Sequence, residues 1–326
     1  MRAAAFRGEL RDPLNWLRWG AACSLAAEQE GLEADREAVD QAVAEFRYEH
    51  DLISAEETEA WLAARGLDAD DLSAHFFRES WLRQMKGKVA APSGDPEPEE
   101  WAGLAAALLI SGGFQPMAVA LVRRLAAPHP AGTDGGAAVA QEREQFLVRH
   151  GLGSGDVRAW LEALGRGEEW LQGMLALEAG YRAHCAAEVT PEKLARALAT
   201  ARLPLTRLEV EQVEFDSLDA VREAELCVRE DGLSLEKVAG ESQYPFQRKQ
   251  LFAEDLPEAE RDSLLFARVG TLLQVAAEGG AFQLRQVVRR FEPQLDEPET
   301  RSRLEQRILE QGFSEAVGSD LRWIIS

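Results

Sequence analysis

Apolar residues recur at helical spacing between residues 15 and 85, and the pattern predicts four helices there. The first ends near Gly31 and the second starts at Asp35. The third opens at Ser54 with a serine-plus-acid signature and stops at Gly66, and the fourth is opened by Asp68 or Asp70. Their inner faces would carry, in chain order, Trp16, Leu17, Trp19, Ala22, Cys23 and Leu25; Glu37, Val39, Val43, Phe46 and Tyr48; Trp61 and Leu62; and Leu72, Phe76, Phe77, Trp81, Leu82 and Met85.

A second copy of this plan lies about a hundred residues further on. The segment FRYEHDLISAEETEAWLAARG at residues 46–66 returns as FLVRHGLGSGDVRAWLEALG at 146–165, with Phe, His, Leu, Ser, Trp, Leu, Ala and Gly in the same order. We interpret this as a duplicated helical module. The expected domains are helical module 1 at 1–91, a proline-rich linker at 92–100 and helical module 2 at 101–200, with an exposed loop at 128–136 inside the second module.

The pattern changes after residue 205. Leu208, Val210, Val213 and Phe215 alternate with charged residues, as in a strand with one buried face. A helix capped by Asp216 or Ser217 should follow, with Ala220, Ala224, Leu226 and Val228 near helical spacing. Next come a short helix at 235–239, an irregular stretch around Pro245, a helix through Leu264, Leu265 and Phe266 that stops at Gly270, and strands at 272–276 and from Phe282 onward, joined by a turn at Gly279-Gly280.

The last part of the chain, 298–326, predicts one more helix with apolar residues Leu304, Ile308, Leu309, Phe313, Val317, Leu321 and Trp323. Seven such side chains would each contribute about 1.5–3 kcal/mol on burial before entropy costs, so the tail should not hang free. We expect it to pack back on the helical region, and its deletion to destabilise that region and not the segment with strands.

The order of elements at 205–293 resembles the parvulin family of peptidyl-prolyl isomerases. The resemblance rests on the helix at 218–226, the run Leu235 to Ala239 with Ser242, the set Phe266, Gly270, Leu272 and Val275, and the run Ala281 to Leu284. Each helical module resembles the N-terminal domain of SurA-type chaperones, through Phe46-Arg47, Leu52, Ser54, Trp61-Leu62 and Gly66-Leu67. The resemblance implies an α+β fold, with a duplicated helical region, a parvulin-like domain and a final helix that completes the helical region.

The departures from the parvulin pattern fall on its chemistry. The resemblance places histidines at two positions where this chain has Glu211 or Gln212, depending on a one-residue choice of register, and Gln283. The segment Phe246 to Phe252 lacks the family's glycine turn, and Arg261 stands where the proline pocket has an aromatic residue. We therefore predict no catalytic residues, although a groove for an extended peptide needs no histidine.

Composition narrows the function further. The net charge of −21 argues against nucleic acid as a partner. The N-terminus has no signal-peptide core, and no stretch approaches eighteen apolar residues, so we expect no membrane span. Three widely spaced cysteines indicate reduced thiols in the cytoplasm. Five histidines without metal spacing and the absence of nucleotide-binding glycine motifs predict no metal and no cofactor.

The sequence favours a non-catalytic, parvulin-like chaperone that holds an extended client or precursor peptide, with peptide maturation as the expected setting. Two alternatives stay open: an active prolyl isomerase with a divergent site, and a dedicated structural partner of another protein in a peptide-maturation complex. The eight tryptophans suit core packing or a peptide-binding crevice between the helical modules. The candidate peptide-binding residues are Gln212, Phe252, Leu256, Phe266, Phe282 and Gln283.

Overall fold

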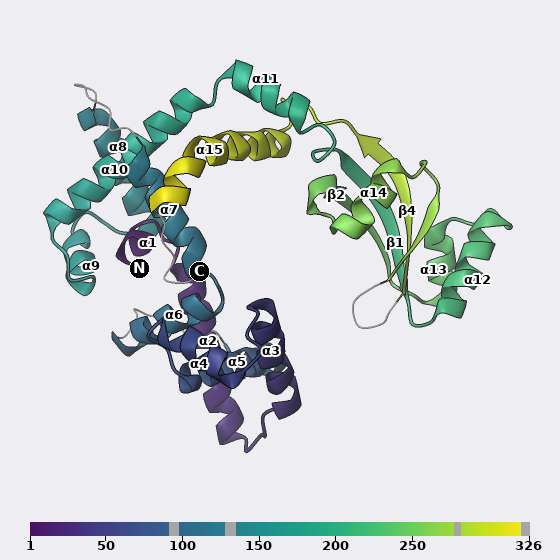
Figure 1. Cartoon of the computed structure of the whole chain (residues 1–326), viewed down its shortest axis with the longest axis horizontal. Helices are drawn as coiled ribbons and strands as arrows, with labels where there is room; N and C mark the ends of the chain where they lie inside the picture. The colour runs from purple at the N-terminus through teal and green to yellow at the C-terminus, as the bar shows by residue number, and fades with distance from the viewer. Residues whose placement is uncertain (91–97, 128–134, 277–281, 321–326) are drawn as a thin grey trace. The chain divides into compact units, whose positions relative to one another are not determined.

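The computed structural model describes residues 1–90, 98–127, 135–276 and 282–320 (Figure 1). The fold class is α+β, as expected: a mostly helical chain with one four-stranded antiparallel sheet. It divides into a helical unit, residues 1–187 with 312–326, and a sheet unit, residues 188–311. Most of the predicted linker, the loop at 128–134, the Gly279-Gly280 turn and the end of the tail lie outside the described residues.

The helical unit begins with α1 (Arg2–Phe6), α2 (Arg11–Gln29), α3 (Arg36–Glu49), α4 (Ala55–Ala63) and α5 (Ala69–Met85). It continues with α6 (Pro98–Ile110), α7 (Phe114–Ala126), α8 (Gly135–His150), α9 (Val157–Ala163) and α10 (Glu168–Glu188). The predicted starts of the early helices are confirmed. Ser54 and Glu57 form a reciprocal capping box, and Asp35 accepts a hydrogen bond from the Ala38 backbone N–H at 3.0 Å.

Three predicted inner-face residues, Leu25, Glu37 and Tyr48, point outward instead. Tyr48 is 87% exposed and Leu25 is 56% exposed. The buried residues of α3 are Val39 and Phe46, seven positions apart and therefore on one face. Tyr48 lies two positions beyond Phe46, which turns its side chain about 200° away from that face.

The duplication is visible in the packing. Phe46, His50 and Trp61 form a ring cluster with centroids 4.6–5.2 Å apart. Phe146, His150 and Trp160 form the same cluster at 4.8–5.1 Å, and both Phe–Trp pairs meet edge to face. Gly66 and Gly165 end the following helix at φ +68° and +60°, which glycine adopts without steric cost. The two modules are thus the same fold unit built twice.

The modules exchange their neighbouring helices. Leu104, Ala107 and Leu108 of α6 pack with Leu14 and Leu17 of α2, so α6 joins the first copy although it was predicted to begin the second. In return, Phe6 of α1 is buried in the second copy. The helix α6 also starts at Pro98, inside the range predicted as a linker.

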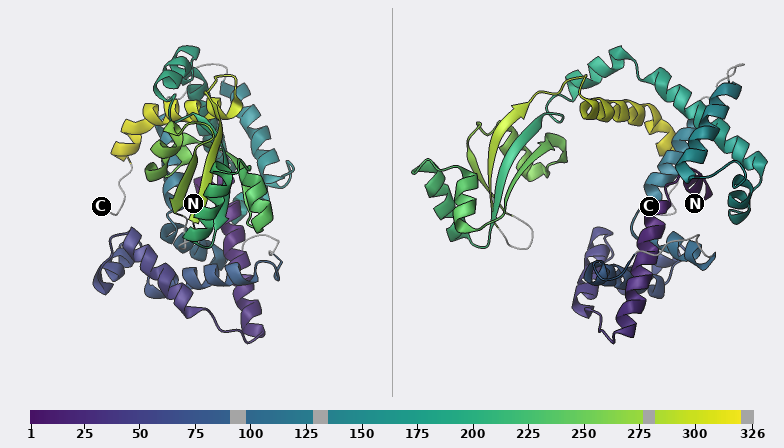
Figure 2. Two further views of the ribbon diagram at one scale, coloured as in Figure 1. Left: turned by 90° about the vertical axis from the view of Figure 1, so that its right-hand side faces the viewer. Right: turned by 180° about the vertical axis from the view of Figure 1, so that it is seen from behind.

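The sheet unit holds α11 (Pro191–Thr200), β1 (Arg207–Phe215), α12 (Leu218–Arg229), α13 (Leu235–Ser242), β2 (Phe246–Phe252), a 3-10 turn η1 (Ala253–Asp255), α14 (Glu258–Phe266), β3 (Leu272–Ala276), β4 (Phe282–Phe291) and most of α15 (Pro298–Asp320). The strand order is β2-β1-β4-β3. Figure 2 shows the unit from two further sides, with α12 and α13 next to each other beside the sheet.

Strand β1 buries apolar side chains on both of its faces, those of its first half on one face and those of its second half on the other. Leu208 and Val210 pack with Leu256 and Leu264 on the face covered by α14. Val213 and Phe215 pack with α12 and α13 on the opposite face. The predicted alternation is confirmed, because all four β1 side chains are at most 2% exposed. The prediction of one buried face was too simple.

Three sequence predictions for this unit are wrong. The stretch after Pro245 is a strand, β2, and was missed because an edge strand with four exposed polar residues carries no apolar alternation. The helix α14 ends at Phe266, before Gly270. Leu226 is 59% exposed, since α12 buries Val221 and Ala224 instead.

The final helix, α15, contributes residues to both units. Leu304 and Ile308 of α15 pack with Leu194, Leu205 and Phe252 in the sheet unit. Phe313 lies in the helical unit, 5.8 Å from the Tyr181 ring and 5.3 Å from the His184 ring. The expectation that the tail supports the helical region alone is therefore wrong. Helix α11, predicted as part of helical module 2, also belongs to the sheet unit through Leu194.

Candidate functional site

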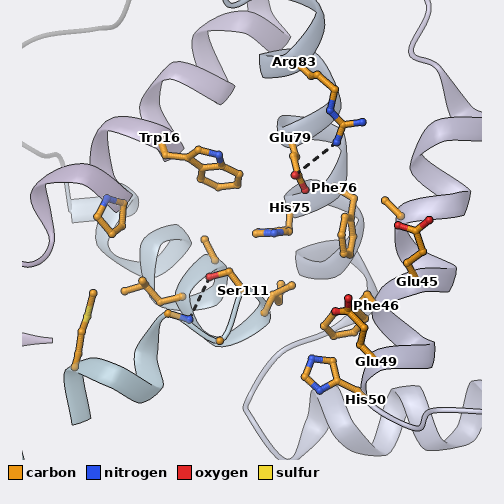
Figure 3. A pocket seen from close by; sticks show the side chains of 18 residues that line it. Trp16, Glu45, Phe46, Glu49, His50, His75, Phe76, Glu79, Arg83 and Ser111 are labelled. Carbon is orange, nitrogen blue, oxygen red and sulfur yellow. Dashed lines mark hydrogen bonds and ion pairs between the residues drawn. The ribbon is translucent and has the colours of Figure 1, made fainter. Parts of the chain in front are cut away.

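A cleft of about 740 Å³ lies inside the helical unit, beside the first copy of the duplicated module (Figure 3). Helices α2, α3 and α5 supply its walls together with the end of α6 and the start of α7. The lining residues are Pro13, Trp16, Ala42, Glu45, Phe46, Glu49, His50, His75, Phe76, Glu79, Arg83, Ala107, Leu108, Ile110, Ser111, Gly112, Gly113 and Met117. Its volume lies in the range of sites that hold a small molecule or a few peptide side chains.

An aromatic row crosses the cleft. The His75 ring lies 5.1 Å from the Trp16 ring and 5.1 Å from the Phe76 ring. Figure 3 shows His75 between these two side chains. Phe76 meets Phe46 at 5.8 Å, and Phe46 meets His50 at 4.6 Å. Aromatic faces of this kind provide apolar contact area at a low entropy cost. The row comes from three predicted helices, and sequence periodicity placed Trp16, Phe46 and Phe76, but neither histidine, on their inner faces.

His75 is the buried polar group of this row. Its side chain is 6% exposed, and its Nδ1 atom is buried with no hydrogen-bond partner in the described part of the chain. Burial, aided by the nearby Arg78 charge, lowers the pKa of His75 to about 4. The imidazole is therefore neutral at pH 7, and one ring nitrogen is left to bond with a group that enters the cleft.

The edge of the cleft is acidic. Glu45, Glu49 and Glu79 line it together with a single arginine, Arg83, among the described lining residues. Arg83 and Glu79 lie 3.6 Å apart, and their side chains are 64% and 42% exposed. A pair of this kind contributes little to stability, so its charges stay free to interact with a ligand.

The turn between α6 and α7 forms one end of the cleft. Gly112 has φ +71°, a conformation that L side chains rarely adopt, and it allows the chain to reverse between Ile110 and Phe114. The two helices meet at a bend of 93°. No single described helix has the length and apolar content needed to cross a membrane, although this bent pair meets both criteria jointly.

The predicted peptide-binding residues of the sheet unit do not come together. Phe252 and Leu256 are 3% and 5% exposed and lie in two different packed clusters. Phe282 packs on the α12 and α13 side of the sheet. Phe266 is 69% exposed. These four apolar residues therefore do not lie together as the walls of one groove.

Gln212 and Gln283 do share a face of the sheet. Gln212 pairs with Arg285, and Glu214 pairs with Gln283, across adjacent antiparallel strands. Directly paired residues point to the same side, so these four side chains lie on the face that also carries Val210 and Val287 and is covered by α14. Gln212 and Gln283, which the sequence resemblance placed at the two histidine positions, thus lie on one face of the sheet.

A polar network occupies this face. The Arg285 guanidinium donates to the Gln283 side-chain oxygen at 2.7 Å and pairs with Glu260 of α14 at 2.5 Å. Gln283 in turn donates to Glu214 at 3.0 Å, and Gln212 donates to Gln247 of β2 at 3.1 Å. Arg261 donates to the backbone carbonyls of Ala253 and Leu256. Amides and charged groups therefore bond to one another on this face of the sheet.

Comparison with known proteins yields likenesses in structure only. No protein-family profile matches the chain, and no curated protein matches its sequence. The structure of the peptidylprolyl isomerase PrsA from Bacillus cereus is similar over 72% of this chain and 93% of that one, at 16% identity and a TM-score of 0.37. The foldase protein PrsA from Streptococcus pneumoniae covers 75% and 90%, at 11% identity and a TM-score of 0.30. A SurA-like chaperone structure from Campylobacter jejuni covers 66% and 82%, at 11% identity and 0.21. At these values the function must be argued from the residues.

The sequence did contain a signal for the cleft. Glutamates at positions 45 and 49 lie one turn apart on the helix that carries Phe46, and His75 adjoins Phe76. The sequence did not show that α6 lies beside α2 and α5. This placement closes the cleft and joins residues about ninety positions apart, such as Trp16 and Ala107. In the described residues, no cluster of three or more His, Cys, Asp or Glu is arranged to hold a metal ion.

Proposed function

We propose that the protein is a non-catalytic, peptide-binding chaperone that holds an apolar segment of a non-native polypeptide in the cleft of its helical unit. The observation that carries this proposal is the aromatic row from Trp16 to Phe46 with the unpartnered Nδ1 of His75 in its middle. An apolar wall with one buried polar group free to bond suits a peptide, which brings both a side chain and backbone polar groups.

The sheet unit supports the non-catalytic part of the proposal. Lowering the X-Pro rotation barrier of about 18–20 kcal/mol in the way proposed for parvulins requires an apolar pocket beside histidines. Here Gln283, Arg285 and Glu260 bond to one another on the corresponding face. Opening that face would break a half-buried ion pair, and the unit therefore serves as a scaffold.

The proposal includes a cytoplasmic setting and a precursor peptide as the client. The three cysteines are free, and Cys23 is fully buried, which suits a compartment where no disulfides are required. A precursor peptide is unfolded before maturation and presents extended apolar segments to a cleft of this size. Co-purification of the protein with peptides from its own cells, followed by mass spectrometry, identifies the client.

The first test is to fill the cleft. Ala42 lies half-buried in the cleft wall on α3, whereas Ala44 is exposed on the same helix outside it. We expect Ala42→Phe to weaken binding of a fluorescein-labelled unfolded client at least tenfold and Ala44→Phe to leave it unchanged, as measured by anisotropy. Equal binding by both variants would contradict the proposal.

The same preparation tests the absence of catalysis. A chromophoric X-Pro peptide assay should show isomerisation at the uncatalysed rate at every protein concentration. An isomerisation rate that rises with protein concentration and falls in Gln283→Ala would show instead that the sheet unit is a catalytic domain.

A further inference from the structure

The two copies of the helical module differ most in their charges, and this difference indicates what the cleft binds. The inference rests on the proposed function. The register between copies is fixed by Phe46 and Phe146 and by the two positive-φ glycines that follow, Gly66 and Gly165. Ala42 then corresponds to Glu142, four residues before the phenylalanine. Arg83 corresponds to Arg182, 17 residues after the glycine.

In the second copy the buried carboxylates lie in ion pairs with arginines of the same unit. Glu142 is 1% exposed and pairs with Arg149 at 3.0 Å and with Arg182 at 2.8 Å. Glu178, also buried, pairs with Arg124 at 2.5 Å. A buried carboxylate needs such partners, because an unpaired one would cost several kcal/mol. Three arginines thus face two glutamates around this copy.

In the first copy the balance of these charges has shifted toward anions. Ala42 replaces Glu142, Glu49 replaces Arg149, and Glu79 stands in the place of Glu178. Of Arg149 and Arg182, only the second keeps its charge in the first copy, as Arg83. Ala42, Glu49, Glu79 and Arg83 all line the cleft. Glu45, which corresponds to Gln145 of the second copy, lines it as well. Three glutamates therefore surround a cleft with one arginine among its described lining residues.

The second copy also shows how a segment of chain lies against this kind of surface. Phe6 of α1 stacks on Phe146 with centroids 5.3 Å apart, and its carbonyl oxygen lies 2.9 Å from His150 Nε2. The Arg149 guanidinium lies 5.9 Å from the Phe6 ring. An aromatic side chain, a backbone carbonyl and a cation are thus combined there. The matching residues of the first copy, Phe46, His50 and Glu49, all line the cleft.

A second observation points to a ligand independently of charge. His75 of the first copy corresponds to Met174 of the second, since each lies nine residues after its glycine. Met174 is an apolar member of the packed cluster. His75 is just as buried, yet it brings a ring nitrogen with no hydrogen-bond partner in the described structure. Such a group is costly to bury unless a ligand bonds to it.

We propose that the cleft binds a basic segment of its client, in which an aromatic or large aliphatic residue is flanked by arginine or lysine. The apolar side chain contacts the aromatic row, and the flanking cations take the place that Arg149 has in the second copy, between Glu45, Glu49 and Glu79. His75 hydrogen-bonds to the client backbone. The net charge of −21 would favour the approach of such segments over acidic ones.

The test compares two short labelled peptides that differ only in the residues beside a central phenylalanine, two arginines in one and two glutamines in the other. We expect the arginine peptide to bind the full-length protein roughly tenfold tighter at low salt, with a smaller advantage at high salt. The double variant Glu45→Gln with Glu49→Gln should lose this advantage while its affinity for the glutamine peptide stays the same. The control variant, Glu28→Gln with Glu144→Gln, removes the same charge from exposed positions outside the cleft and should keep it.

The outcomes distinguish a failure of the basic-segment inference from a failure of the proposed function. An arginine advantage that survives in Glu45→Gln with Glu49→Gln would overturn the basic-segment inference, because it would then reflect the overall acidic charge. Equal affinity of the wild type for the two peptides would also overturn it and leave the proposed function intact. Failure of both peptides and of the unfolded client to bind would defeat the proposed function itself. Should the double variant unfold, Glu49→Arg, which installs the residue of the second copy, is expected to remove the arginine preference alone.

Discussion

His75 shows how one residue can reveal a site through its energetics. It lies in a helix interior between Trp16 and Phe76, where the second copy has Met174. A methionine there would need no hydrogen bond, whereas a buried histidine with an unpartnered nitrogen lowers stability. A residue that weakens the fold and lines a cleft is typical of a position kept for binding.

The lowered pKa of His75 gives a pH dependence with a definite sign. The folded-state pKa of about 4 lies below the ordinary value of 6.5, so between these pH values the unfolded chain binds the proton and the folded chain does not. The free energy of unfolding should therefore fall as pH drops from 6.5 to 4, by up to about 3 kcal/mol from this group. In His75→Met this loss should disappear, and urea unfolding at pH 7 and pH 4.5 measures the difference. An identical pH dependence in both proteins would show that His75 is not held neutral by burial.

At the scale of secondary-structure elements, the sequence predicted the helices and strands that are specified by residues close together in the chain. The helix caps at Asp35 and Ser54 and the alternation of apolar residues on β1 could be predicted, because each depends on residues only a few positions apart. Strand β2 could not, since its stability comes from pairing with β1 and from ion pairs such as Arg248 with Glu209. The candidate groove combined Phe282 with Gln283, although neighbouring residues of one strand point to opposite faces of the sheet. Which helices cover each face is decided by long-range packing, and the sequence did not contain that information.

Helix α15 illustrates an element whose amphipathic pattern was correct but whose partner was not. Leu304 is fully buried against Leu205 and Phe252, and Arg303 pairs with Glu254 and Asp255 of η1 at 2.6 and 2.7 Å. These contacts tie the helix to the sheet unit. The pattern of apolar residues specifies that a face is buried, and it does not specify against what.

Removing the Leu304 side chain should therefore destabilise the sheet unit. We expect Leu304→Ala to lower its free energy of unfolding by about 2–5 kcal/mol, because the side chain leaves a cavity among residues of α11, β2 and α15. The matched control is Leu226→Ala, the same change at a site that is 59% exposed. Hydrogen exchange of the β1 and β2 amides reports on this unit. Faster exchange in the helical unit with an unchanged sheet would restore the original expectation for the tail.

At the scale of the whole molecule, the chain combines one duplicated module in two forms with a sheet unit. The second copy is closed by its own residues, with Phe6 buried and Glu142 paired to two arginines. The first copy keeps an aromatic row, an acidic edge and a cleft. Duplication allows this division, because one copy can stabilise the fold while the other is free to bind.

The most direct measurement is hydrogen–deuterium exchange of the full-length protein with and without a saturating client peptide. Binding in the cleft should slow exchange in α3, in α5 and at residues 111–117, and leave β1, β4 and the second copy unchanged. Protection confined to the sheet unit, or to the helices α8 to α10, would contradict the account and place the client elsewhere.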